Sequence, residues 1–132
     1  MIGIGLIERI KVIHSKHFVH RDMKPENVLI GQGKKDKIIH MIDYGLSKRY
    51  ISPNTGKHIP ISQKAGCIGT LRYISLNAHL GFEHSRRDDL ESIGNILIYF
   101  LCKGKLPWSD FQHPDNEVGP NGKLKEYGEI EY

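Results

Sequence analysis

The sequence predicts a mainly α-helical fold with one small β-hairpin. Two segments, one with apolar residues at helical spacing and one with a long apolar run, predict the main helices. Between them, two short β-branched runs joined by a turn-forming segment predict the hairpin. The length of 132 residues and a composition that is 39% hydrophobic and 26% charged are typical of one globular domain.

The first predicted helix is LIERIKVIHSKHF, residues 6–18. Apolar side chains stand at positions 6, 7, 10, 13 and 18, so one face should pack against a core. His14, His17 and His20 follow one another at intervals of three residues. We expect His20 to pack under the loop that follows, because a zinc site would need support from cysteine or acidic residues.

The predicted hairpin pairs NVLIG (residues 27–31) with KIIHMID (residues 37–43), and GQGKKD separates the two strands. The charged cluster at residues 34–37 fits a solvated turn. Residues 44–75 are polar, contain scattered glycine, proline and serine, and show no clear periodicity. A segment of this length without periodicity predicts either a functional loop or disorder.

The second main helix is predicted at about residues 88–103, in DDLESIGNILIYFLCKG. It begins with acidic residues, which favour a helix N-terminus, and it ends beside Gly104, a typical C-terminal cap. Because the helix is apolar nearly all round, we expect it to be buried. Residues after Ser109 show little helical signal before KLKEYGEIEY.

Charge and cysteine content exclude several classes of protein. The net charge of +4 suits an anionic ligand, but aromatic residues are not interleaved with a clustered basic face, so we expect no nucleic-acid partner. Cys67 and Cys102 form no CxxC motif, which favours reduced thiols in an intracellular protein. The N-terminus does not resemble a signal peptide, and the longest apolar run, 96–102, is too short to cross a membrane.

The segments HRDMKPENVLIG (residues 20–31) and MIDYG (residues 41–45) contain the side chains that phosphoryl transfer needs. Asp22 is a candidate base and Lys24 a candidate cation for the moving phosphate. Asn27 and Asp43 are candidate oxygen donors for Mg²⁺. The hairpin lies between these two donors and should bring them close together, and Gly45 would allow a sharp backbone turn.

These motifs resemble those of a known family. HRDMKPEN resembles the catalytic loop of protein kinases, and DYG resembles their DFG motif, with Tyr44 in place of phenylalanine. HSKHFVHRD, GTLRYIS, SLNAHLG, SRRDDLESIG and LPW occur in the order found in the casein kinase I family. SLN, residues 75–77, stands where that family carries SIN. Over positions 6–108 the chain is thereby identified as similar to the large lobe of a casein kinase I.

The resemblance implies a protein-kinase-like C-terminal lobe without its small lobe, a partial domain over residues 1–132. It places the catalytic loop at residues 20–27, the metal loop at 43–45, the activation segment at 43–77 and the central helix at about 88–103. No glycine-rich loop, strand lysine or helix glutamate of a small lobe is found. GIGLIE at positions 3–8 imitates part of a glycine-rich loop, but it merges into the predicted helix.

The resemblance also implies a role for each site residue. Asp22 would orient the substrate hydroxyl as the base, and Lys24 would contact the γ-phosphate of ATP. Asn27 and Asp43 would hold Mg²⁺ beside the nucleotide. Thr70 would brace Asp22 and Lys24. Each residue alone could be a turn or surface residue, but their order in the chain favours these roles.

Two further residues have implied roles outside this set. Arg72, in LRY, would bind anions on substrates, although an arginine here could also pair with a local acid. Asp89 would hydrogen-bond the backbone around His20 and Arg21. We expect the neighbouring arginines 86 and 87 to lie in a solvated helix start.

The predicted function is therefore that of a serine/threonine protein kinase. It would transfer the γ-phosphate of ATP to Ser or Thr of acidic or primed proteins, and Lys24 fits the serine/threonine class. We expect the chain alone to be weak or inactive, as a monomer in the cytoplasm or nucleus. The alternative is a non-catalytic kinase-lobe scaffold or protein-binding module, and a basic nucleic-acid binder ranks last.

Overall fold

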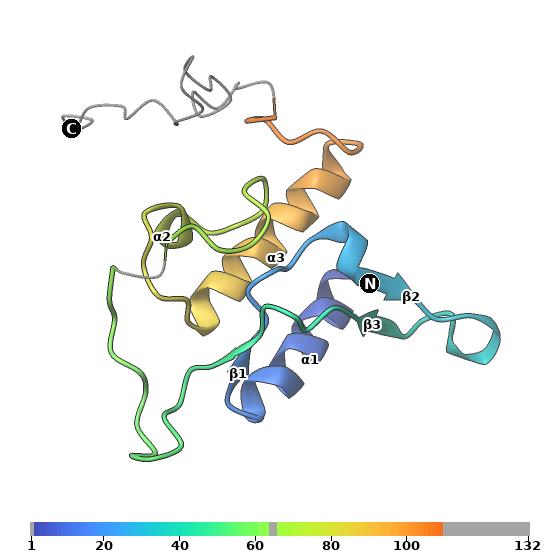
Figure 1. Cartoon of the computed structure of the whole chain (residues 1–132). Helices are drawn as coiled ribbons and strands as arrows, with labels where there is room; N and C mark the ends of the chain where they lie inside the picture. Colours follow the sequence, from blue (N-terminus) through green and yellow to red (C-terminus); the bar gives the residue numbers. More distant parts are fainter. Residues whose placement is uncertain (1, 64–65, 110–132) are drawn as a thin grey trace.

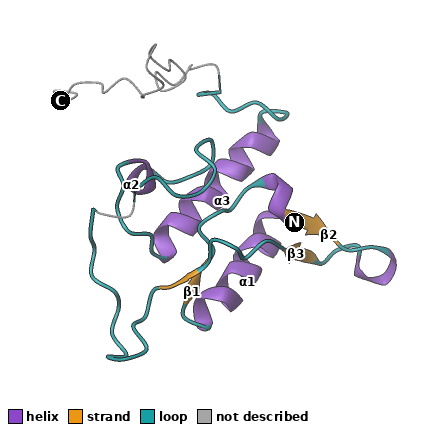
Figure 2. Ribbon diagram, viewed as in Figure 1, coloured by secondary structure: helices purple, strands orange, loops and turns teal. Residues whose placement is uncertain are grey.

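The computed structural model describes residues 2–63 and 66–109 (Figure 1). Helices are its longest regular elements, as the sequence predicts, but it has two small antiparallel sheets where the sequence predicts a single hairpin (Figure 2). The expectations for the tail after Ser109 lie outside the described residues. The elements are α1 (Ile2–Ser15), β1 (Phe18–Val19), β2 (Val28–Ile30), β3 (Ile39–Met41), β4 (Lys48–Arg49), α2 (Leu76–His79) and α3 (Arg86–Leu101).

Helix α1 begins earlier and ends earlier than residues 6–18, so the predicted bounds are wrong. The helix ends because His17 has a φ of 67°, and Phe18 continues into β1, where it pairs with Arg49. At the other end, Gly5 is helical, and a Cβ there would lie 2.6 Å from Cγ1 of Ile39. Close packing of α1 on β3 therefore explains a glycine that helix propensity alone disfavours. GIGLIE is confirmed as part of a helix.

The β2–β3 hairpin is confirmed in the predicted place. Val28 pairs with Met41 and Ile30 pairs with Ile39, and a 3₁₀ turn at Gly33–Lys35 lies in the connection. Ile39 and Met41 are buried while His40 between them is exposed, which is the alternation of a strand with one face on the core. All four residues of the charged cluster at 34–37 are exposed, as expected of a solvated turn.

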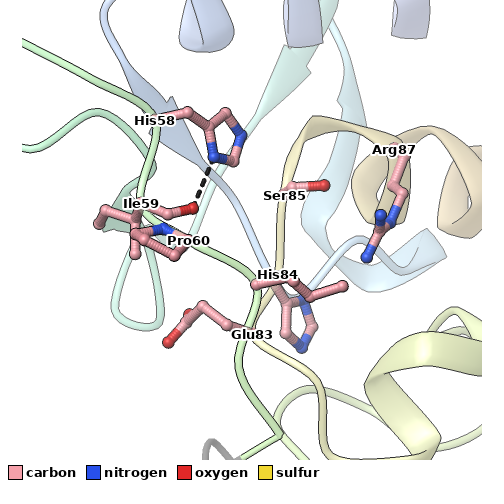
Figure 3. A pocket seen from close by; sticks show the side chains of 8 residues that line it. His58, Ile59, Pro60, Glu83, His84, Ser85 and Arg87 are labelled. Atoms are coloured by element: carbon pink, nitrogen blue, oxygen red, sulfur yellow. Dashed lines mark hydrogen bonds between the residues drawn. The ribbon is translucent and has the colours of Figure 1, made fainter.

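The predicted irregular segment after β3 is held by contacts with distant residues. β4 pairs with β1, and a single bridge joins Ile51 to His58. The Tyr50 hydroxyl donates a hydrogen bond of 2.7 Å to the carbonyl of His14 at the end of α1. Farther along, residues 58–61 face the start of α3 across a pocket of about 120 Å³ (Figure 3).

Helix α3 spans Arg86–Leu101, two residues earlier at each end than predicted. The carboxylate of Asp88 accepts hydrogen bonds from the backbone and hydroxyl of Ser85, which begins the helix. Gly104 follows the helix with a φ of 85°, as expected of a C-terminal glycine. The predicted burial on all sides is wrong, because Leu101 is 83% exposed and Phe100 is 42% exposed. Among the described residues, no helix is long and apolar enough to span a membrane.

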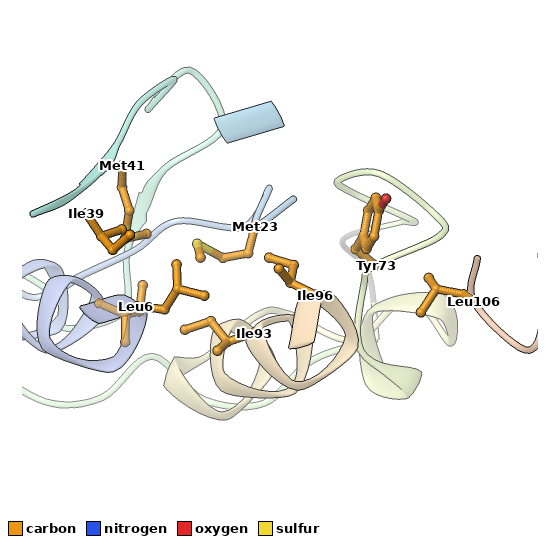
Figure 4. Packing of buried hydrophobic residues seen from close by; sticks show 9 residues of the cluster. Leu6, Met23, Ile39, Met41, Tyr73, Ile93, Ile96 and Leu106 are labelled. Atoms are coloured by element: carbon orange, nitrogen blue, oxygen red, sulfur yellow. The ribbon is translucent and has the colours of Figure 1, made fainter. Parts of the chain in front are cut away.

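The core lies between α1, α3 and the hairpin (Figure 4). Each helix contributes residues at helical spacing, and Met23 of the predicted catalytic loop packs among them. Burying one such side chain contributes about 1.5–3 kcal/mol, so this packing anchors the loop on the helices. The buried cluster comprises Leu6, Ile10, Met23, Ile39, Met41, Tyr73, Ile93, Ile96 and Leu106.

Candidate active site

Asp89 fixes the backbone of the predicted catalytic loop. One carboxylate oxygen accepts a hydrogen bond of 2.9 Å from the His20 amide, and the other accepts one of 3.0 Å from the Arg21 amide. This contact, expected from the family resemblance, is confirmed. His14 on α1 also lies 2.8 Å from Asp89, through Nε2. The carboxylate therefore ties the loop to the start of α3, which carries Asp89, and to the end of α1, which carries His14.

His20 is fully buried beneath the loop, as predicted. The Asp22 amide donates to Nδ1 of His20 at 3.3 Å, so the ring proton is on Nε2, which lies 3.2 Å from the Ile42 carbonyl. The Tyr44 ring lies 5.2 Å from the His20 ring, and its hydroxyl donates to the Met41 carbonyl at 3.1 Å. The hydroxyl of Tyr44 therefore has a hydrogen-bond partner, at the position where the DFG motif of protein kinases has phenylalanine.

Asp22, Lys24, Asn27 and Thr70 form one hydrogen-bonded cluster. Oδ1 of Asp22 accepts bonds from the Thr70 hydroxyl at 2.7 Å and from its amide at 3.0 Å. Oδ2 of Asp22 lies 2.7 Å from Nζ of Lys24 and accepts a bond of 3.3 Å from the Asn27 amide group. Lys24 also donates to the Thr70 hydroxyl at 3.3 Å. The contacts predicted for Thr70 are present; the catalytic roles remain predictions.

The cluster changes the titration of two of its members. Burial acts to raise the pKa of Asp22, but hydrogen bonds from Lys24 and Thr70 outweigh it and leave that pKa below its usual value. The hydrogen bond to Asp22 raises the pKa of Lys24, and the negative charges of Glu26 and Asp43 add to this effect. At neutral pH the site therefore contains a carboxylate beside an ammonium group.

Asn27 and Asp43 are the residues predicted to hold Mg²⁺. The Ile42 amide donates to the Asn27 carbonyl at 3.0 Å, so Asp43 follows directly after a residue bonded to Asn27. Asn27 uses its amide nitrogen to bond Asp22, which leaves its amide oxygen as a donor for a metal. No group of three or more His, Cys, Asp or Glu residues within the described ranges could hold a metal. Two protein oxygens suit Mg²⁺, which keeps water and phosphate ligands.

The turn after Asp43 differs in detail from the predicted one. The chain turns at Gly45, where the Ser47 amide bonds the Tyr44 carbonyl, but the left-handed residue is Asp43, with a φ of 60°. Gly45 also leaves room for the carboxylate of Asp43. Its amide donates to Oδ1 of Asp43 at 3.2 Å, and a Cβ on Gly45 would lie 3.2 Å from that same oxygen.

Arg72 lies beside this cluster and not within it. Its side chain is exposed and lines a surface pocket of about 570 Å³. Its backbone carbonyl accepts a hydrogen bond of 3.0 Å from the Trp108 indole, which fixes the loop. The same pocket is lined by Thr70, so Arg72, the residue predicted to bind substrate anions, lies beside the cluster. Its lining residues are Glu26, Gly69, Thr70, Leu71, Arg72 and Tyr73.

Sequence reasoning missed the surroundings of Arg21. Its guanidinium donates to the Leu46 carbonyl at 2.6 Å and lies 3.7 Å from the carboxylate of Glu83. Glu83 also pairs with Lys48. The three charges lie in separate parts of the sequence, so no local pattern signals that they meet.

Comparison with known families agrees with this geometry. A family model of the protein kinase domain matches residues 2–124. Since that range covers most of the chain, the chain belongs to the protein kinase domain family. The small set of helices and antiparallel sheets in the described residues is consistent with an incomplete kinase domain. The kinase part of the predicted resemblance is confirmed, and the narrower assignment to casein kinase I remains a prediction.

Proposed function

We propose that this chain carries the transfer site of a serine/threonine kinase of casein kinase I type. The reaction would move the γ-phosphate of ATP to Ser or Thr of acidic or primed proteins. The observation that supports it best is the cluster in which Thr70 and Lys24 both contact the carboxylate of Asp22, with Asn27 bonded to the same side chain. These groups supply a base, a cation and a metal donor together.

Asp22 would orient the acceptor hydroxyl and take its proton. Because its pKa is below the usual value, the side chain is ionised at neutral pH and can accept a hydrogen bond. Thr70 contributes two donors to Oδ1, which fixes the plane of the carboxylate. Oδ2 is the oxygen available to the substrate once Lys24 has turned away.

Lys24 would move between two anions. Its side chain is 24% exposed, so it has room to leave the Oδ2 atom that it contacts at 2.7 Å. A transferring phosphate carries more negative charge than one carboxylate and would attract the ammonium group. Asn27 and Asp43 would hold Mg²⁺, which neutralises phosphate charge when bound.

Arg72 would recognise the acidic or phosphorylated part of the protein substrate. Arg72 is exposed and lines the pocket beside Thr70, and a guanidinium group can bind a carboxylate or phosphate through two hydrogen bonds. Glu26 lines the same pocket and would repel an anion placed close to it. The substrate anion is therefore expected on the Arg72 side of the pocket.

We expect transfer by this chain alone to be weak or undetectable. Gly3 and Gly5 lie inside α1, so they form no loop over a nucleotide. Within the described ranges, the groups proposed to hold the nucleotide phosphates, directly or through Mg²⁺, are Lys24, Asn27 and Asp43 alone. Transfer depends on positioning and electrostatics, so a nucleotide held by these groups alone would react orders of magnitude more slowly than one held from both sides.

The test compares nucleotide binding and casein phosphorylation in three proteins: the unmodified chain, Asp43→Ala and Asp36→Ala. Asp36 is an exposed acid of the hairpin connection and serves as the matched control. Mg-ATP should raise the thermal midpoint of the unmodified chain and of Asp36→Ala, but not of Asp43→Ala. Any phosphorylation of casein should follow the same pattern.

A folded, unmodified chain that Mg-ATP does not stabilise would contradict this function. The non-catalytic binding module would then be the better account of the fold. Equal stabilisation of Asp43→Ala would instead contradict the assignment of Asp43 as a metal donor.

A further inference from the structure

Glu83 connects two parts of the chain that flank the proposed active site. Its Oε2 lies 2.6 Å from Nζ of Lys48 on β4, and its Oε1 lies 3.7 Å from the guanidinium of Arg21. Its own amide donates to the Ser62 carbonyl at 2.7 Å. Figure 3 shows the Glu83 side chain beside the segment that carries Ile59 and Pro60. One acidic residue therefore touches the catalytic loop and both ends of the segment at residues 46–62.

The position of Arg21 matters because it immediately precedes Asp22. Arg21 has a φ of 70°, a left-handed conformation that a side chain disfavours and that surrounding contacts must maintain. Its amide is held by Asp89, and its Nε donates to the Leu46 carbonyl at 2.6 Å. Contacts to the Arg21 side chain thus link the segment after Asp43 to the loop that carries the proposed base.

The positive charges of Arg21 and Lys48 need a negative group beside them. The Arg21 side chain is 13% exposed, and a guanidinium with so little water around it needs a counter-charge. Lys48, which is 44% exposed, brings a second positive charge to the same carboxylate. Without Glu83, Arg21 and Lys48 would both lose the carboxylate that they share, and the repulsion between their positive charges would push the segment away from the loop.

We propose that Glu83 is a positioning residue, a built-in anion that holds residues 46–62 against the catalytic loop. Through Arg21 it keeps the backbone before Asp22 in its left-handed conformation. Through Lys48 it keeps β4 beside β1. The consequence for phosphoryl transfer rests on the proposed function, whereas the anchoring of the segment does not.

Amide hydrogen exchange of the full chain tests the anchoring without any turnover. Glu83→Gln keeps the shape of the side chain and removes its charge, and Lys48→Met removes one partner, whose side chain is 44% exposed. Amides of residues 46–59 should exchange about tenfold faster in both variants. Lys57→Met, an exposed lysine of the same segment, is the matched control and should leave exchange unchanged. The β2–β3 amides should exchange equally in all four proteins.

Inorganic sulfate provides a second, independent readout. In Glu83→Gln, low millimolar sulfate should replace the missing carboxylate and restore slow exchange. It should not restore slow exchange in the double variant Glu83→Gln, Lys48→Met, which lacks one cation. Unchanged exchange in both single variants would overturn the proposal, and so would equal effects of sulfate on every variant. Neither result depends on ATP, so the proposed function can fail while the anchoring holds.

Discussion

At the scale of single residues, Thr70 joins the parts of the proposed active site. Its hydroxyl donates to Asp22 at 2.7 Å and accepts a bond from Lys24 at 3.3 Å, while its amide also donates to Asp22. The hydroxyl therefore holds the base and the cation in a fixed relation. The backbone bond would survive a change of side chain, and the hydroxyl bonds would not.

Replacing Thr70 with valine should lower the free energy of unfolding by about 1–2 kcal/mol, because the Asp22 carboxylate loses a donor. Thr70→Ser keeps the hydroxyl and is the matched control, expected to lie within about 0.5 kcal/mol of the unmodified chain. Urea denaturation of the three proteins measures both values. If valine and serine behave alike, the hydroxyl does not organise this site.

At the scale of elements, two glycines with left-handed backbones differ in their surroundings. Gly69 precedes Thr70 with a φ of 100°, and a Cβ there would lie 2.5 Å from the Arg21 carbonyl and 2.8 Å from Ile74. Gly56, in the turn after β4, has a φ of 66°, and a Cβ there would meet nothing within 4 Å. Only the first glycine packs two segments together.

Alanine at these two positions separates backbone strain from crowding. Gly56→Ala should cost about 1–2 kcal/mol of unfolding free energy, the cost of a left-handed side-chain residue. Gly69→Ala should cost about 1–3 kcal/mol more, because the catalytic loop must move away from the added methyl group. Thermal denaturation of both variants gives the comparison, and equal losses would show that residues 69 and 21 do not pack as described.

The elements that sequence patterns predict are those held by local interactions. The hairpin at Val28–Ile30 and Ile39–Met41 follows from β-branched runs and a turn, and the centre of α3 follows from its apolar run and its caps. The pairing of Phe18 with Arg49 has no such pattern, because two-residue strands show no alternation. The end of α1 was missed since it depends on one left-handed residue, His17.

The candidate site likewise has a part that lies close together in the sequence and a part that only the fold brings together. Asp22, Lys24 and Asn27 lie within one short loop, and motif order alone associates them with Thr70 and Asp43. Their meeting is seen in the structure. The role of Glu83 could not be predicted, because its partners lie 35 and 62 positions earlier in the chain.

At the scale of the whole molecule, stability should depend on pH through His84. This side chain is 6% exposed, and its Nε2 has no hydrogen-bond partner among the described residues. Burial lowers the pKa of His84, more than the nearby carboxylate of Asp88 raises it. The folded state thus disfavours the proton. The stability that comes from the neutral ring is fully present above the usual value of 6.5 and is lost as the pH falls below it.

His84→Gln cannot gain a proton, so its unfolding free energy should fall less between about pH 7 and pH 5 than that of the unmodified chain. His40→Gln, at an exposed histidine of β3, is the matched control and should keep the full pH dependence. Urea denaturation at a series of pH values measures the slopes. Parallel slopes for all three proteins would exclude His84 as the source.

The bond between Asp89 and the loop also has a consequence for the order of folding. The amide of His20 and the carboxylate of Asp89 are separated by 69 positions along the chain. Closing so large a loop carries an entropic cost before the contact returns any stabilisation, which slows its formation. During synthesis, residues 20–22 leave the ribosome long before residue 89 exists. We therefore expect the loop at residues 20–27 to acquire its shape late, when α3 docks on α1.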